Sequence, residues 1–263
     1  MFYCKYINIL CQQFTGVNYM KSLPQKSIFQ INYNPKLSFY DQLYKNKNFT
    51  SKFPHWKTDR LTVTLRDHDK KHSMLIAYNK IVFESDMYDK KTEEEIISLL
   101  ISEITNFADD GTFTRFGLRR IFLIKQEMSF SELVEIINLK YFSNGFKSIF
   151  KNKIKDSSII ITSPINGNEF NLTLGPMKKE EIPVYMKFNI DNHVDPEPQK
   201  RIKILNEIFS NYPDVALYLN IDYYLKREGL NKDNLENFWE LSNSDIPQLI
   251  DDITSELFKE KLK

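Results

Sequence analysis

Histidines and acids at short spacing are the first residues that could do chemistry. His68 and His72 lie four positions apart, beside Asp67 and Asp69. On a helix this spacing would bring both imidazoles to one side, where they could hold zinc. The flanking segments alternate as strands do, so the run is predicted to be a solvated hairpin turn. No HExxH motif and no third ligand at a familiar spacing accompanies it.

Acids at strand ends are the second candidate group. Asp191 and Asp222 both sit at the ends of predicted strands, and with Lys187 or Lys226 nearby they could converge as the acids of a metal-dependent nuclease do. Asp is also common at strand ends because it caps turns. No Ser-His-Asp arrangement, GxSxG motif or phosphate-binding glycine loop is present, and the chain has only 7 glycines. We therefore predict no catalytic residue, no metal and no cofactor.

Residues 139–155 form the segment that most resembles a partner site. Lys147 and Lys151 alternate with Phe146 and Phe150 there. Lysines can neutralise phosphates while aromatic rings stack on bases. The alternative is an amphipathic helix that buries its aromatic residues in the core and keeps its lysines in water. We expect this amphipathic helix.

Three arginines occupy a long predicted strand. Arg115 and Arg119 share one face of it, and Arg120 takes the other face, because side chains alternate along a strand. A charged arginine on a mostly buried strand needs a carboxylate or phosphate partner. The structural expectation is an ion pair with an acid such as Asp222, and the functional expectation is an anion or partner site.

Strands and helices of ordinary length must position these residues. Strands are predicted where apolar residues alternate or cluster, at 27–33, 61–65, 74–78, 81–83, 113–124, 158–163, 169–174, 184–190 and 215–225. Helices are predicted from Thr92, which precedes acidic residues, and from Ser129 or Ser131. Further helical spacing occurs at 199–209, 232–241 and 246–262.

The order of these elements suggests an internal duplication. Three strands, a helix, a strand and a helix occur twice, with an offset of roughly 100 residues between matching strands. The predicted fold class is α+β, with two similar antiparallel-sheet halves on which helices pack. Residues 1–19 would be an N-terminal extension, residues 20–150 one half and residues 151–263 the other. Coincidence is the alternative, because the two halves share almost no residue identity.

Composition describes an ordinary globular chain. Hydrophobic residues make up 41% and charged residues 27% of it, which argues against wholesale disorder. The net charge of +1 means that nucleic-acid binding would depend on a local basic surface. The only cysteines, Cys4 and Cys11, form no disulfide framework, and no apolar run approaches membrane-spanning length. We predict a cytoplasmic protein without membrane contact.

Three short motifs resemble those of a known family. They are Phe53-Pro54, the run Arg115 to Arg120 (RFGLRR) and the run Leu219 to Tyr224 (LNIDYY). Together they resemble a sporadically distributed family of uncharacterised bacterial and archaeal proteins of about this length, over residues 22–260. That family usually carries an aromatic residue where Arg120 stands. The resemblance implies no established activity, and its patchy distribution is typical of mobile or defence-associated genes.

We therefore expect a noncatalytic binding or regulatory protein that recognises a protein partner. The alternative is a nucleic-acid-binding protein, including a metal-dependent nuclease. The candidate partner or anion site comprises Arg115, Arg119, Arg120, Lys147, Lys151 and Asp222.

Overall fold

The structure is a computed structural model that describes residues 25–35, 47–86, 88–106, 108–151, 153–186, 206 and 209–259. In these ranges nine strands form one antiparallel sheet in the order β2-β3-β4-β5-β1-β6-β9-β8-β7. The strands are β1 (Lys26–Tyr33), β2 (His55–Thr58), β3 (Thr62–Asp67), β4 (His72–Ala77), β5 (Lys80–Ser85), β6 (Phe113–Lys125), β7 (Ile159–Ile165), β8 (Asn168–Lys178) and β9 (Val215–Leu230). The predicted α+β class and antiparallel pairing are confirmed.

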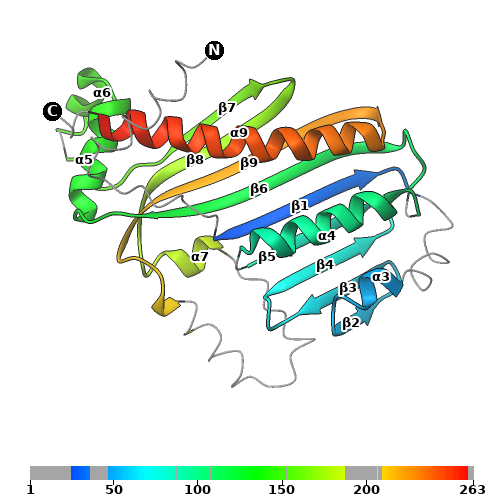
Figure 1. Cartoon of the computed structure of the whole chain (residues 1–263). Coiled ribbons are helices and arrows are strands. Elements are labelled where there is room, and N and C mark those ends of the chain that lie inside the picture. Colours follow the sequence, from blue (N-terminus) through cyan, green and yellow to red (C-terminus); the bar gives the residue numbers. More distant parts are fainter. Residues whose placement is uncertain are drawn as a thin grey trace, which may run out of the picture.

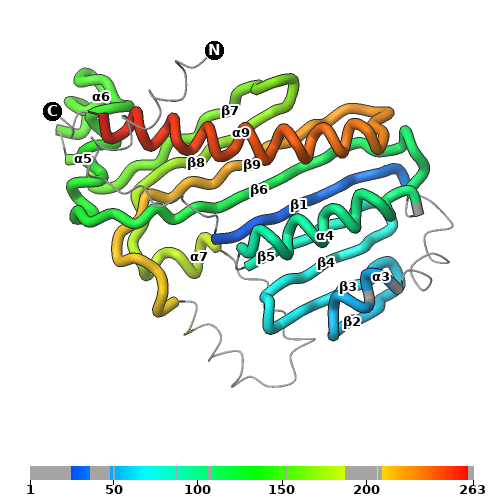
Figure 2. The backbone as a smooth tube through the Cα atoms, in the orientation of Figure 1, coloured from blue at the N-terminus to red at the C-terminus, as the bar shows by residue number. Residues whose placement is uncertain are grey.

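The helices of the described ranges lie around this sheet (Figure 1). They are α3 (Lys47–Thr50), α4 (Lys90–Glu103), the 3-10 turn η1 (Ile104–Asn106), α5 (Phe130–Tyr141), α6 (Asn144–Ile149), α7 (Ile182–Met186) and α9 (Lys232–Phe258). The two long helices, α4 and α9, run across the same face of the sheet, and we call this the helix face (Figure 1). The backbone tube shows β1, β6, β9 and β8 side by side beneath them (Figure 2).

Every second side chain of the central strands points toward the helices, and these side chains fill the space beneath them. Phe116 and Leu118 of β6 and Tyr223 of β9 are buried on the helix face. The Tyr223 ring stacks on Phe238 of α9 with 5.6 Å between ring centroids, and the Phe116 ring lies 6.1 Å from the same residue. Fully burying one such side chain contributes about 1.5–3 kcal/mol. Most of the hydrophobic core lies in this layer.

Both long helices begin at caps of the expected chemistry, although not always at the expected residue. The N-cap of α4 is Asp89, which accepts from the Lys91 amide, whereas the sequence indicated Thr92. Asn231 caps α9 with a reciprocal bond to Asn234. The two helical segments predicted at 232–241 and 246–262 are one helix that continues through Pro247 as far as Phe258.

The opposite face of the sheet carries a smaller apolar cluster at one end. Ile121 of β6, Met177 of β8 and Ala216 of β9 pack there against Ile182 and Met186 of α7. Farther along the same strands the side chains on this face are polar. We define the polar face by Arg115, Arg119, Asn220, Asp222 and Tyr224, which are neighbours in the register of β6 and β9.

The expected duplication is not confirmed. In the N-terminal half β1 lies between β5 and β6, whereas in the C-terminal half β8 pairs directly with β9. All strands also belong to one sheet, so the two predicted halves share it.

Other predicted elements differ in detail. The strand expected at 184–190 is wrong over its first three residues, which close the helix α7, and its remainder lies outside the described residues. The predicted extension at 1–19 and nearly all of the helix predicted at 199–209 also lie outside them. The exposed strand β2 was not predicted, because its four residues do not alternate between apolar and polar.

Candidate functional site

The helix α5 is fixed firmly to the sheet. A capping box starts it: the Ser129 hydroxyl accepts from the Glu132 amide at 3.3 Å, and the Glu132 carboxylate accepts from the Ser129 amide at 2.7 Å. This confirms one of the two serines predicted to cap the helix. Leu133 and Ile137 are fully buried and belong to the main core. The rest of α5 is therefore held in a defined position above β8.

The short helix α6 follows α5 after a break and buries none of its side chains. Its N-cap Ser143 accepts from the Phe146 amide at 3.2 Å. Phe146 is 43% exposed, Ile149 is 72% exposed, and Phe150 at the C-cap is 49% exposed. The expectation that these aromatic residues lie in the core is wrong. A helix of six residues offers little apolar surface to bury, and the rings of Phe142, Phe146 and Phe150 pack on one another instead.

Large apolar side chains gather around α6. Leu139 at the end of α5 is 62% exposed. We call Leu139, Phe146, Ile149 and Phe150 the α6 ridge. The Phe146 ring packs between Phe142 and Phe150, with 5.2 Å between centroids on each side. Exposed apolar side chains that gather in one place are a common mark of an interaction site.

The segment that carries most of the α6 ridge is rich in lysine. Residues 139–155 contain five lysines and no aspartate or glutamate. Lys140 forms an ion pair with Glu256 of α9, which ties α5 to that helix. Lys147 and Lys151 have no ion pair within the ranges that the structure describes. The ridge is therefore an apolar surface in a positively charged setting.

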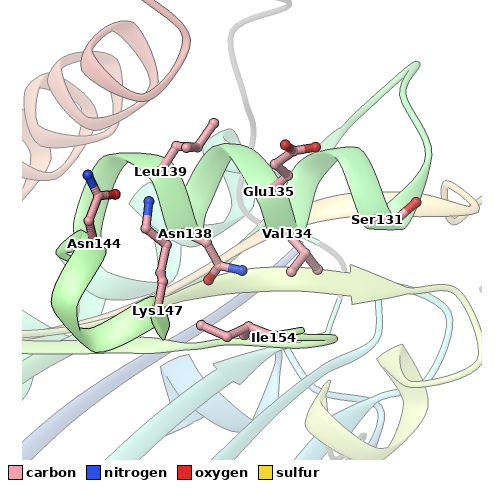
Figure 3. A pocket seen from close by; sticks show the side chains of 8 residues that line it. All are labelled: Ser131, Val134, Glu135, Asn138, Leu139, Asn144, Lys147 and Ile154. Carbon is pink, nitrogen blue, oxygen red and sulfur yellow. The ribbon is translucent and has the colours of Figure 1, made fainter. Parts of the chain in front are cut away.

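A hollow of about 470 Å³ opens between α5 and α6 (Figure 3). Glu135, Asn138 and Lys147 contribute its ionic and amide groups, and Val134 and Ile154 contribute apolar walls. Sequence reasoning singled out Lys147 but missed Glu135 and Asn138. Asn138 could have been found from its position. It lies four residues after Val134 and so shares the buried face of the helix, where an apolar residue is expected.

On the polar face, Arg115 and Asp222 form the predicted ion pair. Their nearest atoms, Arg115 Nη2 and Asp222 Oδ2, are 3.2 Å apart. The Arg115 guanidinium lies over Gly117: a Cβ added to this glycine would be 3.4 Å from the central guanidinium carbon. The same carbon is 4.9 Å from the centroid of the Tyr224 ring. Burial raises the pKa of the Asp222 carboxyl above its ordinary value, although Arg115 and Arg119 both oppose the rise.

The remaining groups of the polar face also pair with one another. Arg119 Nε donates to Asn220 Oδ1 at 2.8 Å, and the Tyr224 hydroxyl donates to Glu169 at 2.6 Å. Arg119 lies directly opposite Asp222 in the strand register. The structure therefore brings together Arg115, Arg119 and Asp222 from the predicted set, and it gives each of them a partner within the sheet.

Arg120 points to the helix face, as the alternation predicted. Its guanidinium is 3.0 Å from the Glu93 carboxylate of α4 and donates to Asn243 of α9, also at 3.0 Å. The Ser27 hydroxyl of β1 donates to the other oxygen of Glu93. Burial raises the pKa of the adjacent Tyr88 hydroxyl to about 12, although the charge of Arg120 opposes the rise. Arg120 thus connects the sheet to both long helices and lies on the opposite face of the sheet from Arg115, Arg119 and Asp222.

The other chemical candidates do not assemble. His72 is buried at the start of β4, while His68 lies in the preceding turn and its ring faces that of His55, with 4.9 Å between centroids. Asp191 lies outside the described residues. Among the described residues no group of three His, Cys, Asp or Glu side chains could hold a metal ion.

No protein-family model matches the sequence, and no curated protein matches it either. The resemblance to the sporadically distributed family therefore stays a prediction. Within the described ranges, no helix has the length and apolar character that crossing a membrane requires.

Proposed function

We propose that the protein is a noncatalytic binding protein that recognises an acidic, amphipathic segment of a protein partner through the α6 ridge. The observation that carries this proposal is that α6 buries none of its own side chains yet presents Phe146 and Ile149 to solvent. Burial of such side chains supplies most of the free energy of protein association. The surrounding lysines favour a partner of negative charge, which would be steered to the surface.

Nucleic acid is the rival ligand, because aromatic residues alternate with lysines in this segment. Two features favour a protein. The Phe146 ring packs between Phe142 and Phe150 and so does not stand free to stack on a base. The most exposed side chains of the α6 ridge, Ile149 and Leu139, are aliphatic and offer no ring to a base. Aliphatic and aromatic groups together suit the apolar face of a partner helix.

Site-specific crosslinking tests the proposal in the native cell. A photoreactive phenylalanine derivative replaces Ile149, and in a matched control it replaces Val184 of α7, whose exposure of 70% is nearly the same as the 72% of Ile149. We expect one discrete protein to be crosslinked from position 149 and not from position 184. With that protein purified, Phe146→Ser should weaken its binding by about tenfold. Added salt should weaken binding further, because the partner is acidic.

Two results would overturn the proposal. Position 149 could yield the same products as position 184, which would mean that the ridge has no specific partner. Alternatively, position 149 could crosslink only to RNA or DNA, which would establish the rival function.

A further inference from the structure

The two edges of the sheet are built differently. At one edge β2 has only four residues, it follows Pro54, and Lys57 brings a charge to it. Short length, charge and proline are features that keep an edge strand from pairing with another chain. At the other edge β7 has seven residues, and residues 157–168 contain no charged side chain. Among the described strands β7 pairs only with β8, and it lies at the outer margin of the sheet (Figures 1 and 2).

The exposed side chains of β7 are apolar. Ile160 is 74% exposed on the same side of the sheet as the polar face, and Ile161 is 40% exposed on the helix face. Ile161 stands in one row with Leu172 of β8 and Ile221 of β9, which are 2% and 0% exposed. The main core thus continues to the last strand and meets water there. A further strand with an apolar residue opposite Ile161 would complete this row.

The backbone of β7 determines which residues can pair outward. Residues 166–167 form a two-residue turn to β8, with φ values of 51° and 79°. In such a hairpin the two residues that flank the turn exchange both hydrogen bonds. Because the bonding direction alternates along a strand, Ile160 and Thr162 direct their N–H and C=O groups away from β8. Pro164 also faces outward, where its missing N–H removes no bond to β8.

We propose that β7 pairs with β7 of a second copy of this chain across a two-fold axis, so that the two sheets join. The edge is self-complementary in one antiparallel register. With Ile161 opposite its counterpart at the axis, Ile160 exchanges hydrogen bonds with Thr162 of the second copy, and Pro164 falls at the ends of the pairing. Because residues 157–168 carry no charge, the paired strands bring no like charges together.

The size of this interface sets the expected affinity. Pairing of one short strand buries less than about 1,200 Å², which is the range of weak complexes, so we expect a dimer in the micromolar range. The edge at β7 is a surface other than the α6 ridge, and the inference does not depend on the proposed function.

Sedimentation of the full-length protein tests the pairing. The wild type should dimerise with a dissociation constant of about 10–100 μM. Ile161→Lys places two lysines opposite each other at the axis and should raise this constant at least about tenfold. Val184→Lys adds the same charge on α7, at a side chain that is 70% exposed, and should leave the constant unchanged. An unchanged melting temperature at about 1 μM, where the monomer dominates, shows that Ile161→Lys is folded.

Oxidation of cysteine variants tests the register. Both native cysteines, Cys4 and Cys11, are first replaced by serine. Ile161→Cys should then form a disulfide-linked dimer, because Cα atoms directly opposite each other in a non-hydrogen-bonded pair are about 4.5 Å apart. Ile160→Cys is the control, since this position is more exposed but lies diagonally from its counterpart, about 7–8 Å away. It should be crosslinked at least about tenfold more slowly, because that separation is too long for a disulfide.

Three results would overturn the proposal. A wild type that stays monomeric at about 500 μM would show that the edge does not pair with itself, and a strand of another protein would be its occupant instead. A dimer that Ile161→Lys does not weaken would use another surface, such as the α6 ridge. Equal crosslinking of Ile160→Cys and Ile161→Cys would exclude the two-fold pairing at Ile161.

Discussion

Replacing Glu93 with glutamine would test the buried connection between the sheet and the long helices. Glutamine keeps the shape of the side chain and can still accept from Ser27, but it removes the charge that compensates Arg120. Both side chains of the pair are almost fully shielded from water, at 5% exposure for Arg120 and 1% for Glu93. The guanidinium would therefore remain buried without a counter-charge.

The size of the effect follows from this burial. Breaking a buried ion pair by removing one partner costs about 3–5 kcal/mol, because the other charge stays desolvated. The hydrogen bond from Arg120 to Asn243 at 3.0 Å and the neighbouring Trp239 ring, 6.0 Å from the guanidinium, provide no negative charge in its place. For a chain of this size the melting temperature should fall by roughly 6–20 °C.

Comparing Glu93→Gln with Glu94→Gln in urea denaturation separates the loss of the buried ion pair from the general effect of removing an acid from α4. Glu94 follows Glu93 in α4, but its side chain is 49% exposed and its ion pair with Lys90 spans 3.6 Å. Glu94→Gln should therefore cost no more than about 0.5 kcal/mol. The double variant Glu93→Leu with Arg120→Met should recover most of the stability lost in Glu93→Gln, because it leaves neither charge buried.

If Glu93→Gln and Glu94→Gln differ in unfolding free energy by less than about 1 kcal/mol, Glu93 does not compensate the buried charge of Arg120. A double variant whose cost equals the sum of the costs of its two single substitutions would likewise show that Glu93 and Arg120 are not coupled, since residues in contact should couple.

Three further predictions concern other parts of the fold. Ile149→Ser should change the free energy of unfolding by less than about 0.5 kcal/mol, whereas Ile137→Ala should cost about 2–5 kcal/mol; equal costs in urea denaturation would mean that α6 is packed after all. Because burial raises the pKa of Asp222 above its ordinary value of 3.8, the folded state binds this proton more tightly than the unfolded state does. The stability of the wild type relative to Asp222→Asn should therefore fall as the pH rises from about 3.8 through the raised pKa, and a difference that grows with pH would contradict this assignment. Pro247 is exposed inside α9, so Pro247→Ala should raise stability by about 1–3 kcal/mol in thermal denaturation, and a loss would show that the helix depends on the proline.

The sequence predicted helices and strands well where they depend on residues that are neighbours in the chain. The capping residue Ser129 and the strand over 113–124 were found because side-chain spacing and cap chemistry depend on neighbours in the chain. The helix α7 was missed because Val184 and Met186 alternate with their neighbours as strand residues do. Over five residues the two periods cannot be separated.

Long-range pairing was predictable only in part. Period-two alternation correctly separated Arg120 from Arg115 and Arg119, and the pairing of Arg115 with Asp222 is confirmed. The partner of Arg120 was not predicted, because nothing local shows that Glu93 comes to lie above β6. Glu93 looked like an ordinary acid of a helix's first turn, and its role depends on how α4 packs.

The contrast between the polar face and the α6 ridge is the reason that we propose the ridge as the binding surface. On the polar face, Arg115 and Arg119 already have partners within the sheet, so a ligand anion would have to compete with Asp222 and Asn220. On the ridge, Ile149 is mostly surrounded by water. Association with a partner would remove this water from an apolar side chain, which is favourable. The helix α5 is meanwhile fixed by its buried residues and by the ion pair of Lys140 with Glu256. Of the ridge residues only Leu139 belongs to this fixed helix. Ordering the side chains of α6 on binding costs conformational entropy, and the burial of Phe146, Ile149 and Phe150 must exceed that cost for the ridge to yield affinity.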